Sequence, residues 1–234
     1  MAHILVYALG FSTVVGCTQG YGTTSVAMSG RVTEYVPGSA DEGPPIDGVE
    51  VCQFQSNNCS VTDASGEYEL MVLKGRELEI SHIKDGYGPV LVARRSGDED
   101  FVGDAVLGTD AVMTSFADAL DTPYPPAGTG FVSATTYRGP VSDGTTLAGA
   151  SYFLTGSGGL SYYLDDAGAP DTSLAETQDA GAGGFVEVAP VNVTLRVAGA
   201  ANCTSADSWF AAGTNAFTLP VRNGFWTQSH ISCE

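Results

Sequence analysis

The sequence predicts an all-β protein built from two tandem β-sandwich domains joined by a short helical linker. Three observations lead to this prediction. The chain has 234 residues, enough for two domains of roughly 100 residues each. Its 30 glycines and 11 prolines suit many short strands joined by tight turns. Short apolar runs recur between these turns, and several alternate with polar residues, as half-buried strands require.

The first 17 residues have the pattern of an export signal. Residues 4–11 form an apolar run that is too short to span a bilayer and has the length of a signal-peptide core. Small residues precede Cys17, and the segment resembles the lipobox of bacterial lipoproteins. The resemblance implies a lipid on Cys17 that anchors an exported protein to the cell envelope, at the outer membrane. The apolar run has no Lys or Arg before it, which departs from the usual pattern, so plain secretion and a buried strand remain alternatives.

A Gly/Thr-rich tether is predicted over 18–26, where it would hold the folded part away from a membrane. Four further cysteines fit an exported chain: Cys52, Cys59, Cys203 and Cys233. Four cysteines allow three disulfide connectivities, and proximity in sequence favours Cys52–Cys59 and Cys203–Cys233. A zinc site is disfavoured, because the chain has no Cys-x-x-Cys spacing and only three histidines.

The first sandwich is predicted over 27–96. Residues 67–73 alternate clearly and put Tyr68, Leu70 and Val72 on one face. Asp-Gly and Asp-x-x-Gly turns separate the strand-like runs, because Asp side chains bond nearby backbone N–H groups and Gly accepts a positive φ. The strands expected here are 26–32, 49–54, 59–62, 67–73, 77–83 and 90–93.

A linker with one short helix is predicted over 97–127. Apolar residues recur near helical spacing over 110–120, with Asp110 placed to cap the helix N-terminus. A Thr-Pro-Tyr-Pro-Pro segment then ends the helix, because proline cannot continue it.

The second sandwich is predicted over 128–234. Residues 191–197 alternate apolar and polar side chains, as a two-faced strand does. The Asn-Gly pair at 223–224 lies between two strand-prone runs and predicts a hairpin whose outer strand ends at Cys233. Three segments of the two halves match in the same order at an offset of about 100 residues, which predicts two related sandwiches.

The first half also carries a recognisable motif. It reads Thr62-Asp63-x-x-Gly66-x-Tyr68, followed by a Gly-Tyr pair at 86–87. This pattern resembles the carboxypeptidase regulatory-like domain over about residues 27–94, whereas 128–234 shares only its spacing. The resemblance implies an Ig-like or transthyretin-like β-sandwich with a non-catalytic role. The family names no catalytic residues, so none are expected from it.

The charge excludes two classes of partner. Nine Lys and Arg stand against 27 Asp and Glu, a net charge of −18. Nucleic-acid binding needs a basic face, and electrostatic adhesion to anionic lipid needs a basic patch, so neither is expected. Acidic clusters at 98–100 and 165–166 offer oxygen ligands for Ca²⁺, but none matches a calcium-loop pattern, so solvated loops are favoured.

The sequence offers little for catalysis. His3, His82 and His230 form no His-Glu-x-x-His motif, and no Gly-x-Ser-x-Gly elbow is present. We therefore expect no enzyme, no metal site and no cofactor. An active site assembled from distant loops is the less favoured alternative.

Three aromatic pairs raise a different possibility. Tyr163, Trp209 and Trp226 could form a platform for sugar rings. Alternation along strands favours a plainer interpretation, in which one member of each pair fills the core and its neighbour covers an edge. The sequence thus favours a structural or interaction module with a protein or glycan partner at the cell surface. A carbohydrate-binding module is the alternative.

Overall fold

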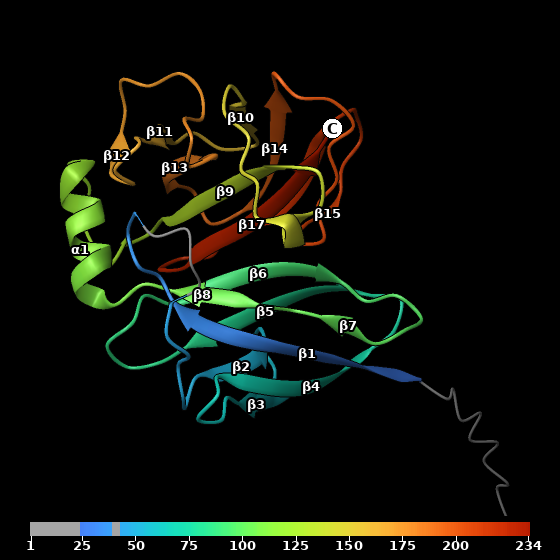
Figure 1. The fold of residues 1–234 in the computed structure, drawn as a ribbon. Coiled ribbons are helices and arrows are strands. Elements are labelled where there is room, and N and C mark those ends of the chain that lie inside the picture. Colours follow the sequence, from blue (N-terminus) through green and yellow to red (C-terminus); the bar gives the residue numbers. More distant parts are fainter. Residues whose placement is uncertain (1–23, 39–42) are drawn as a thin grey trace, which may run out of the picture.

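The computed structural model describes residues 24–38 and 43–234. The predicted signal peptide, Cys17 and most of the predicted tether lie outside these residues, while the end of the tether, from Ser25, already belongs to strand β1 (Ser25–Glu34). The described chain forms strands β1 to β17, one α-helix, α1 (Asp110–Ala119), and a short 3-10 turn (Val141–Asp143). The all-β prediction with one short helix is confirmed (Figure 1).

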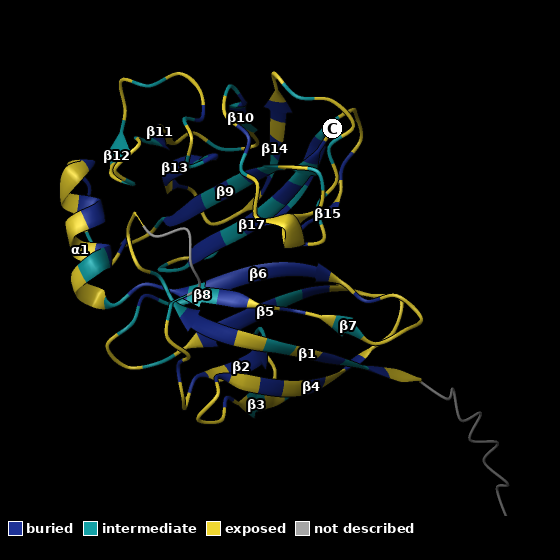
Figure 2. Ribbon diagram, viewed as in Figure 1, coloured by how far each residue is buried: buried dark blue, intermediate teal, exposed yellow. Residues whose placement is uncertain are grey.

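The first sandwich packs a small sheet on one face of a larger one. The small sheet has the order β4-β1-β7, with β8 also paired to β1. In β4 every second side chain is buried, as the alternation predicted, and Figure 2 shows the same alternation along the ribbon. The facing part of the larger sheet has the order β6-β5-β2-β3. The strands are β2 (Glu50–Gln53), β3 (Cys59–Val61), β4 (Glu67–Leu73), β5 (Glu77–Ile83), β6 (Val90–Arg95), β7 (Phe101–Val102) and β8 (Ala105–Leu107).

The second sandwich repeats this arrangement. One of its sheets has the order β10-β14-β16-β15, and it packs on strands β11, β13, β9 and β17 of the larger sheet. In β14, Val193, Leu195 and Val197 are buried and alternate with more exposed residues, as predicted. The strands are β9 (Gly130–Arg138), β10 (Ser151–Thr155), β11 (Leu160–Leu164), β12 (Pro170–Asp171), β13 (Ala182–Val188), β14 (Asn192–Ala198), β15 (Trp209–Phe210), β16 (Ala216–Pro220) and β17 (Trp226–Cys233).

The two sandwiches share one topology. The antiparallel β1–β4 pair with parallel β8 corresponds to the antiparallel β9–β13 pair with parallel β17. The antiparallel set β2-β5-β6 corresponds to β10-β14-β16. The internal repeat that the sequence suggested therefore appears as two equivalent sets of strand pairings.

A threonine forms the same bonds in each half. The Thr62 hydroxyl donates to the carbonyl of Ile46 at 2.7 Å and accepts from the amide of Val49 at 2.8 Å. Thr177 makes both bonds at the equivalent place of the second sandwich. Each threonine is buried, so these bonds satisfy backbone groups at a turn where water cannot reach them.

The last strand joins the halves into a continuous nine-stranded sheet. β17 lies between β9 and β6 and is parallel to both (Figure 1). The Asn223-Gly224 turn therefore does not close a hairpin, and that prediction is wrong. β16 pairs with β14 and β15, so the turn carries the chain from one sheet to the other. Asn223 still serves the turn, because its Oδ1 accepts the amide of Gly128 at 2.6 Å.

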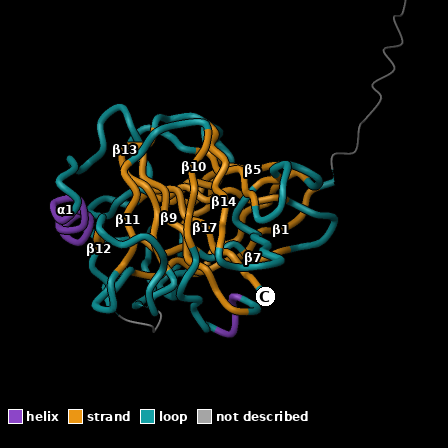
Figure 3. Tube along the Cα trace, turned by 90° about the horizontal axis from the view of Figure 1, so that it is seen from above, coloured by secondary structure: helices purple, strands orange, loops and turns teal. Residues whose placement is uncertain are grey.

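Residues 97–127, which were predicted to be a linker, also contribute two strands to the first sandwich. β7 and β8 lie within this range and pair with β1, so they complete the first sandwich. Helix α1 then lies beside β11 and β12, as Figure 3 shows. Its cap is Thr109, whose Oγ1 accepts the amide of Val112, rather than the predicted Asp110. Phe116 of α1 packs on Tyr162 and Trp226, with ring centroids 5.1 and 5.5 Å apart.

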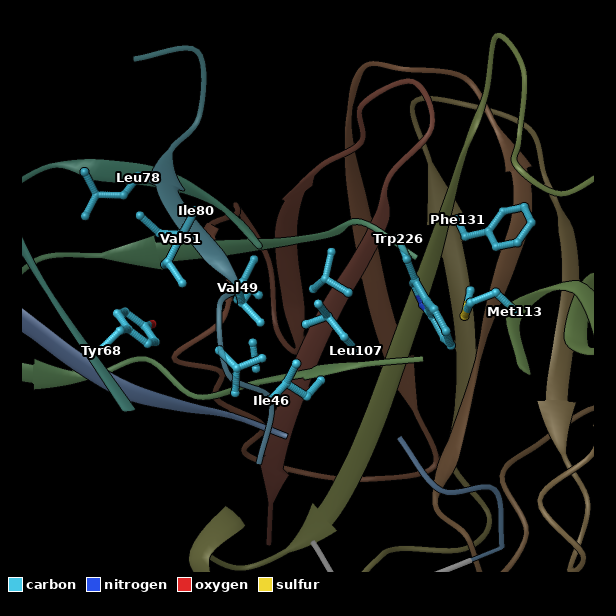
Figure 4. Packing of buried hydrophobic residues seen from close by; sticks show 14 of the residues in the cluster. Ile46, Val49, Val51, Tyr68, Leu78, Ile80, Leu107, Met113, Phe131 and Trp226 are labelled. Carbon is cyan, nitrogen blue, oxygen red and sulfur yellow. The ribbon is translucent and has the colours of Figure 1, made fainter. Parts of the chain in front are cut away.

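A single hydrophobic cluster runs from the first sandwich to α1. Figure 4 shows Tyr68, Leu78 and Ile80 on one side of this cluster and Phe131 and Trp226 on the other. A second cluster fills the space between the two sheets of the second sandwich. Within the described residues, no helix has both the length and the apolar character needed to cross a membrane.

Candidate functional site

The structure contains both predicted disulfides. Cys52–Cys59 joins neighbouring positions of β2 and β3, and Cys203–Cys233 ties the β14–β15 connection to the end of β17. Among the described residues, the one group of three potential metal ligands is Glu50 with Cys52 and Cys59. The two sulfurs are bonded to each other, so they offer no thiolate to a metal.

The three aromatic residues considered for sugar stacking are buried. Trp209 and Trp226 are each 8% exposed and Tyr163 is 3% exposed. The Trp209 indole donates to the carbonyls of Leu78 and Arg94 at 3.2 Å. These side chains therefore form no open platform for a sugar ring, which corrects that speculative assignment.

A buried charge network connects the two halves. The pairing of β17 with β6 ends at Gln228, and beyond it Asp207, from the segment before β15, lies between Arg94 of β6 and His230 of β17. Oδ1 of Asp207 forms an ion pair with the Arg94 guanidinium of β6. Oδ2 accepts the backbone amide of His230 at 3.1 Å and lies 2.5 Å from Nδ1 of the His230 ring. Arg94 also donates to the carbonyl of Asp104 at 2.9 Å. The network fills a gap in the sheet with paired charges, as burial of charge requires.

An Asp–His pair of this kind could in principle orient a general base. Here the same carboxylate is held by Arg94, and the pKa of His230 is lowered to about 4 by burial and then by the Arg94 charge. Ser205 and Ser229 lie 3.2 Å apart in the same region, but they contact each other and the turn rather than the His230 ring. The arrangement therefore holds β6, β17 and the segment before β15 together.

His82 is more deeply buried. It is 1% exposed on β5, and its ring lies against Tyr68 with centroids 6.0 Å apart. Neither ring nitrogen has a hydrogen-bond partner among the described residues. Burial, and after it the Arg94 charge, lowers the pKa of His82 to about 3, so the ring is neutral at ordinary pH. The neutral His82 ring therefore packs in the core and is not accessible to bind a metal or a substrate.

A hollow that is open to solvent lies on the outer face of the first sandwich, with a volume of about 690 Å³. It crosses the small sheet from β7 over β1 to β4 and reaches β3. We call it the β1–β4 hollow. Its lining residues are Ser29, Gly30, Arg31, Ser60, Val61, Asp63, Glu67, Tyr68, Glu69, Val102 and Asp104.

The register explains why the sheet is hollowed here. Ser29 of β1 lies between Glu69 of β4 and Val102 of β7, and Gly30 follows it. Small side chains in the middle strand leave space between longer side chains on either side. Val61 and Val102 are 61% and 66% exposed, so the hollow has apolar walls that are open to solvent.

Sequence reasoning did not find this site. The alternation in 67–73 implied that Glu67 and Glu69 face outward, and the structure confirms that both are exposed. What places them beside Ser29 and Val102 is the pairing of β1 with β4 and with β7, across more than 30 residues of sequence in each case. No local signal reveals such a pairing.

Comparisons with known proteins identify no family. No family model matches the chain, and no curated protein matches it. Solved structures give weak similarities. One is a chain of a type II cohesin–X-dockerin complex from Acetivibrio cellulolyticus, with 16% identity and a TM-score of 0.30 over 36% of this chain and 58% of that one.

Two further structures cover more of the chain. The Bacillus anthracis TIE protein has 14% identity and a TM-score of 0.27 over 89% of this chain and 34% of its own length. The minor pilin GBS52 of Streptococcus agalactiae has 13% identity and a TM-score of 0.25, over 89% of this chain and 95% of that one. Scores of this size support no functional argument, so the resemblance to carboxypeptidase regulatory-like domains stays a prediction.

Proposed function

We propose that this protein is a non-catalytic structural or interaction module of the cell envelope, related to carboxypeptidase regulatory-like domains. In this proposal it is exported and held on the outer membrane by a lipid on Cys17. The main support is where the chemically active side chains lie. His82 is packed in the core, and Arg94 and His230 are bound to Asp207 in the buried network. The β1–β4 hollow, in contrast, is open to solvent.

The disulfides support the exported location. Disulfides persist in oxidising compartments and are rare where thioredoxin and glutathione keep thiols reduced. Both bonds sit at structural positions, one across a strand pair and one at the end of the strand that joins the halves. A protein that depends on such bonds is suited to the cell surface.

Fatty-acid labelling of the full chain tests the lipid anchor. Cells expressing the wild type should incorporate a labelled fatty acid into the protein, and Cys17→Ala should abolish the label. Cys52→Ala with Cys59→Ala is the matched control, because it removes cysteines of the same chain and should keep the label. Equal labelling of wild type and Cys17→Ala would reject the anchor.

A protein partner is favoured over a glycan. Sugar binding commonly uses exposed aromatic rings, and Tyr163, Trp209 and Trp226 are buried. The hollow instead offers carboxylates and aliphatic side chains, which suit polypeptide side chains. Saturable retention of the folded full chain on a polysaccharide column would contradict this preference.

A further inference from the structure

We propose that the β1–β4 hollow docks a basic segment of a partner protein, with a Lys or Arg side chain lying among the hollow's carboxylates. The proposal rests on the proposed function as an interaction module and names the chemistry of its partner. Shape, charge, the free strand edge and the comparison with the second sandwich each support it.

The shape suits a long side chain. Ser29, Gly30 and Ser60 provide a low floor, and Val61 and Val102 provide exposed apolar walls. Lys and Arg combine an aliphatic stem with a charged end, so they bury the stem on apolar surface while the charge stays near polar groups. A hollow with apolar sides and an acidic rim fits that combination.

The charge of the lining is negative. Four carboxylates, from Asp63, Glu67, Glu69 and Asp104, face one guanidinium, that of Arg31. Asp63 and Asp104 are fixed in part by the fold: Oδ1 of Asp63 accepts two backbone amides, and Oδ1 of Asp104 accepts the amide of Arg31.

The charges of the two glutamates have no partner within residues 24–38 and 43–234. Arg31 directs its Nε to the carbonyl of Ser65. Among the described residues, neither the Glu67 nor the Glu69 carboxylate takes part in a hydrogen bond or an ion pair, so these two charges are available to a cation. A net charge of −18 on the whole chain also attracts basic partners at long range.

The edge of β4 favours a polypeptide over a small cation. The amide of Val32 donates to the carbonyl of Gly66, so alternation directs the backbone of Glu69 away from β1. Within 24–38 and 43–234, β4 pairs only with β1. The N–H and C=O groups of Glu69 therefore point away from β1 at this edge of β4, where they can bond the backbone of an extended segment.

In the second sandwich, the sheet face equivalent to that of β1 and β4 is covered by other residues of the chain. The amides of Val32 and Thr136 bond the carbonyls of Gly66 and Gly181 in the same way. Counted back and forward from these positions, Ala27 of β1 and Met71 of β4 correspond to Phe131 of β9 and Val186 of β13. Phe131 and Val186 are buried in the cluster that α1 covers, whereas Met71 is 50% exposed. The same sheet face is thus covered in the second sandwich, whereas in the first it stays open among the described residues, and a partner segment would supply the cover.

Fluorescence anisotropy of a labelled peptide tests the proposal on the full chain in detergent. The probe is Gly-Ser-Lys-Val-Lys-Ser-Gly, and its acidic counterpart has Glu in place of both Lys. We expect saturable binding of the basic peptide only. Replacing Glu67→Gln and Glu69→Gln together should weaken it roughly tenfold or more, because two charge-assisted contacts are lost. Raising salt from about 50 to about 300 mM should weaken it as well.

Matched variants separate local contacts from general charge. Glu77→Gln with Glu176→Gln removes two exposed carboxylates elsewhere and should leave binding unchanged. Ser29→Phe fills the floor without altering charge and should abolish binding, while Ser25→Phe, on the same strand face outside the hollow, should not.

Three results would overturn the proposal: no saturable binding of the basic peptide, equal weakening by both Glu→Gln pairs, or binding that Ser29→Phe leaves intact. Binding of Ca²⁺ by titration calorimetry without binding of the peptide would also overturn it. None of these results bears on fatty-acid labelling at Cys17, so failure of this proposal is distinguishable from failure of the proposed function.

Discussion

His82 should make the protein sensitive to acid, and replacing it should remove part of that sensitivity. The ring is fully buried, its nitrogens have no partner among the described residues, and its pKa is lowered to about 3. In the unfolded chain a histidine has a pKa of about 6.5. Between these values the unfolded state binds a proton that the folded state excludes, so stability falls as pH drops from 6.5 toward 3.

The size of the effect follows from the shift. Each pH unit within this window costs about 1.4 kcal/mol, and the whole window costs roughly 5 kcal/mol. The pKa of His230 is lowered to about 4, in the same direction, so two histidines contribute between pH 4 and 6.5. At neutral pH both rings are uncharged. The two ring nitrogens of His82 then lower the free energy of unfolding by about 1–3 kcal/mol, because they are buried without hydrogen-bond partners among the described residues.

His82→Leu is the informative variant. We expect it to raise the free energy of unfolding by about 1–3 kcal/mol at pH 7, because an unsatisfied polar ring is replaced by an aliphatic side chain. We also expect the slope of stability against pH near pH 5–6 to fall by about 1.4 kcal/mol per unit, leaving the contribution of His230. Urea unfolding of the two proteins at pH 5, 6 and 7 measures both quantities.

Ile83→Leu on the exposed side of the same strand is the control, and it should change neither stability nor slope by more than about 0.5 kcal/mol. The reasoning fails if His82→Leu lowers stability at pH 7 by more than about 1 kcal/mol. It also fails if the variant keeps the full wild-type slope between pH 5 and 6.

Three further predictions concern the scaffold. Asp207→Asn should lower stability by about 3–5 kcal/mol, because it leaves the Arg94 charge buried without its carboxylate, and Arg94→Met with Asp207→Leu should cost clearly less in the same urea titration. Cys203→Ser with Cys233→Ser should cost about 3.5 kcal/mol by the loop-entropy model for a separation of 30 residues, and reduction of the wild type should reproduce the loss. Trp226→Ala should cost about 3–5 kcal/mol through the cavity it leaves, visible as a lower thermal midpoint.

The chain's local chemistry determined its strands. Residues 67–73 and 191–197 alternate with a period of two, and that period fixes which side chains share a face wherever the strand pairs. The turn after β3 followed from local chemistry as well, because the Asp63 carboxylate accepts the amides of Ser65 and Glu67, within four residues of sequence. The disulfide pairing also followed from proximity, since the nearer cysteines in each half are bonded.

Local chemistry does not determine which strands pair, as the Asn223-Gly224 turn shows. Asn-Gly favours a tight chain reversal, and Gly224 does adopt a positive φ of 82°. The turn residues do not decide which strand pairs with the one that follows. Here β17 bonds β6 and β9 instead of β16, because its two faces complete two different cores.

The composition and periodicity of this sequence were enough to determine an all-β chain, its two related halves and its cysteine pairs, because each depends on neighbours along the chain. Only the tertiary structure decided that Trp209 and Trp226 are buried and that residues 101–107 complete the first sandwich. It alone placed Ser29 between Glu69 and Val102 to form the hollow. Burial and strand register are set by contacts between distant segments, and a single sequence carries no local record of those contacts.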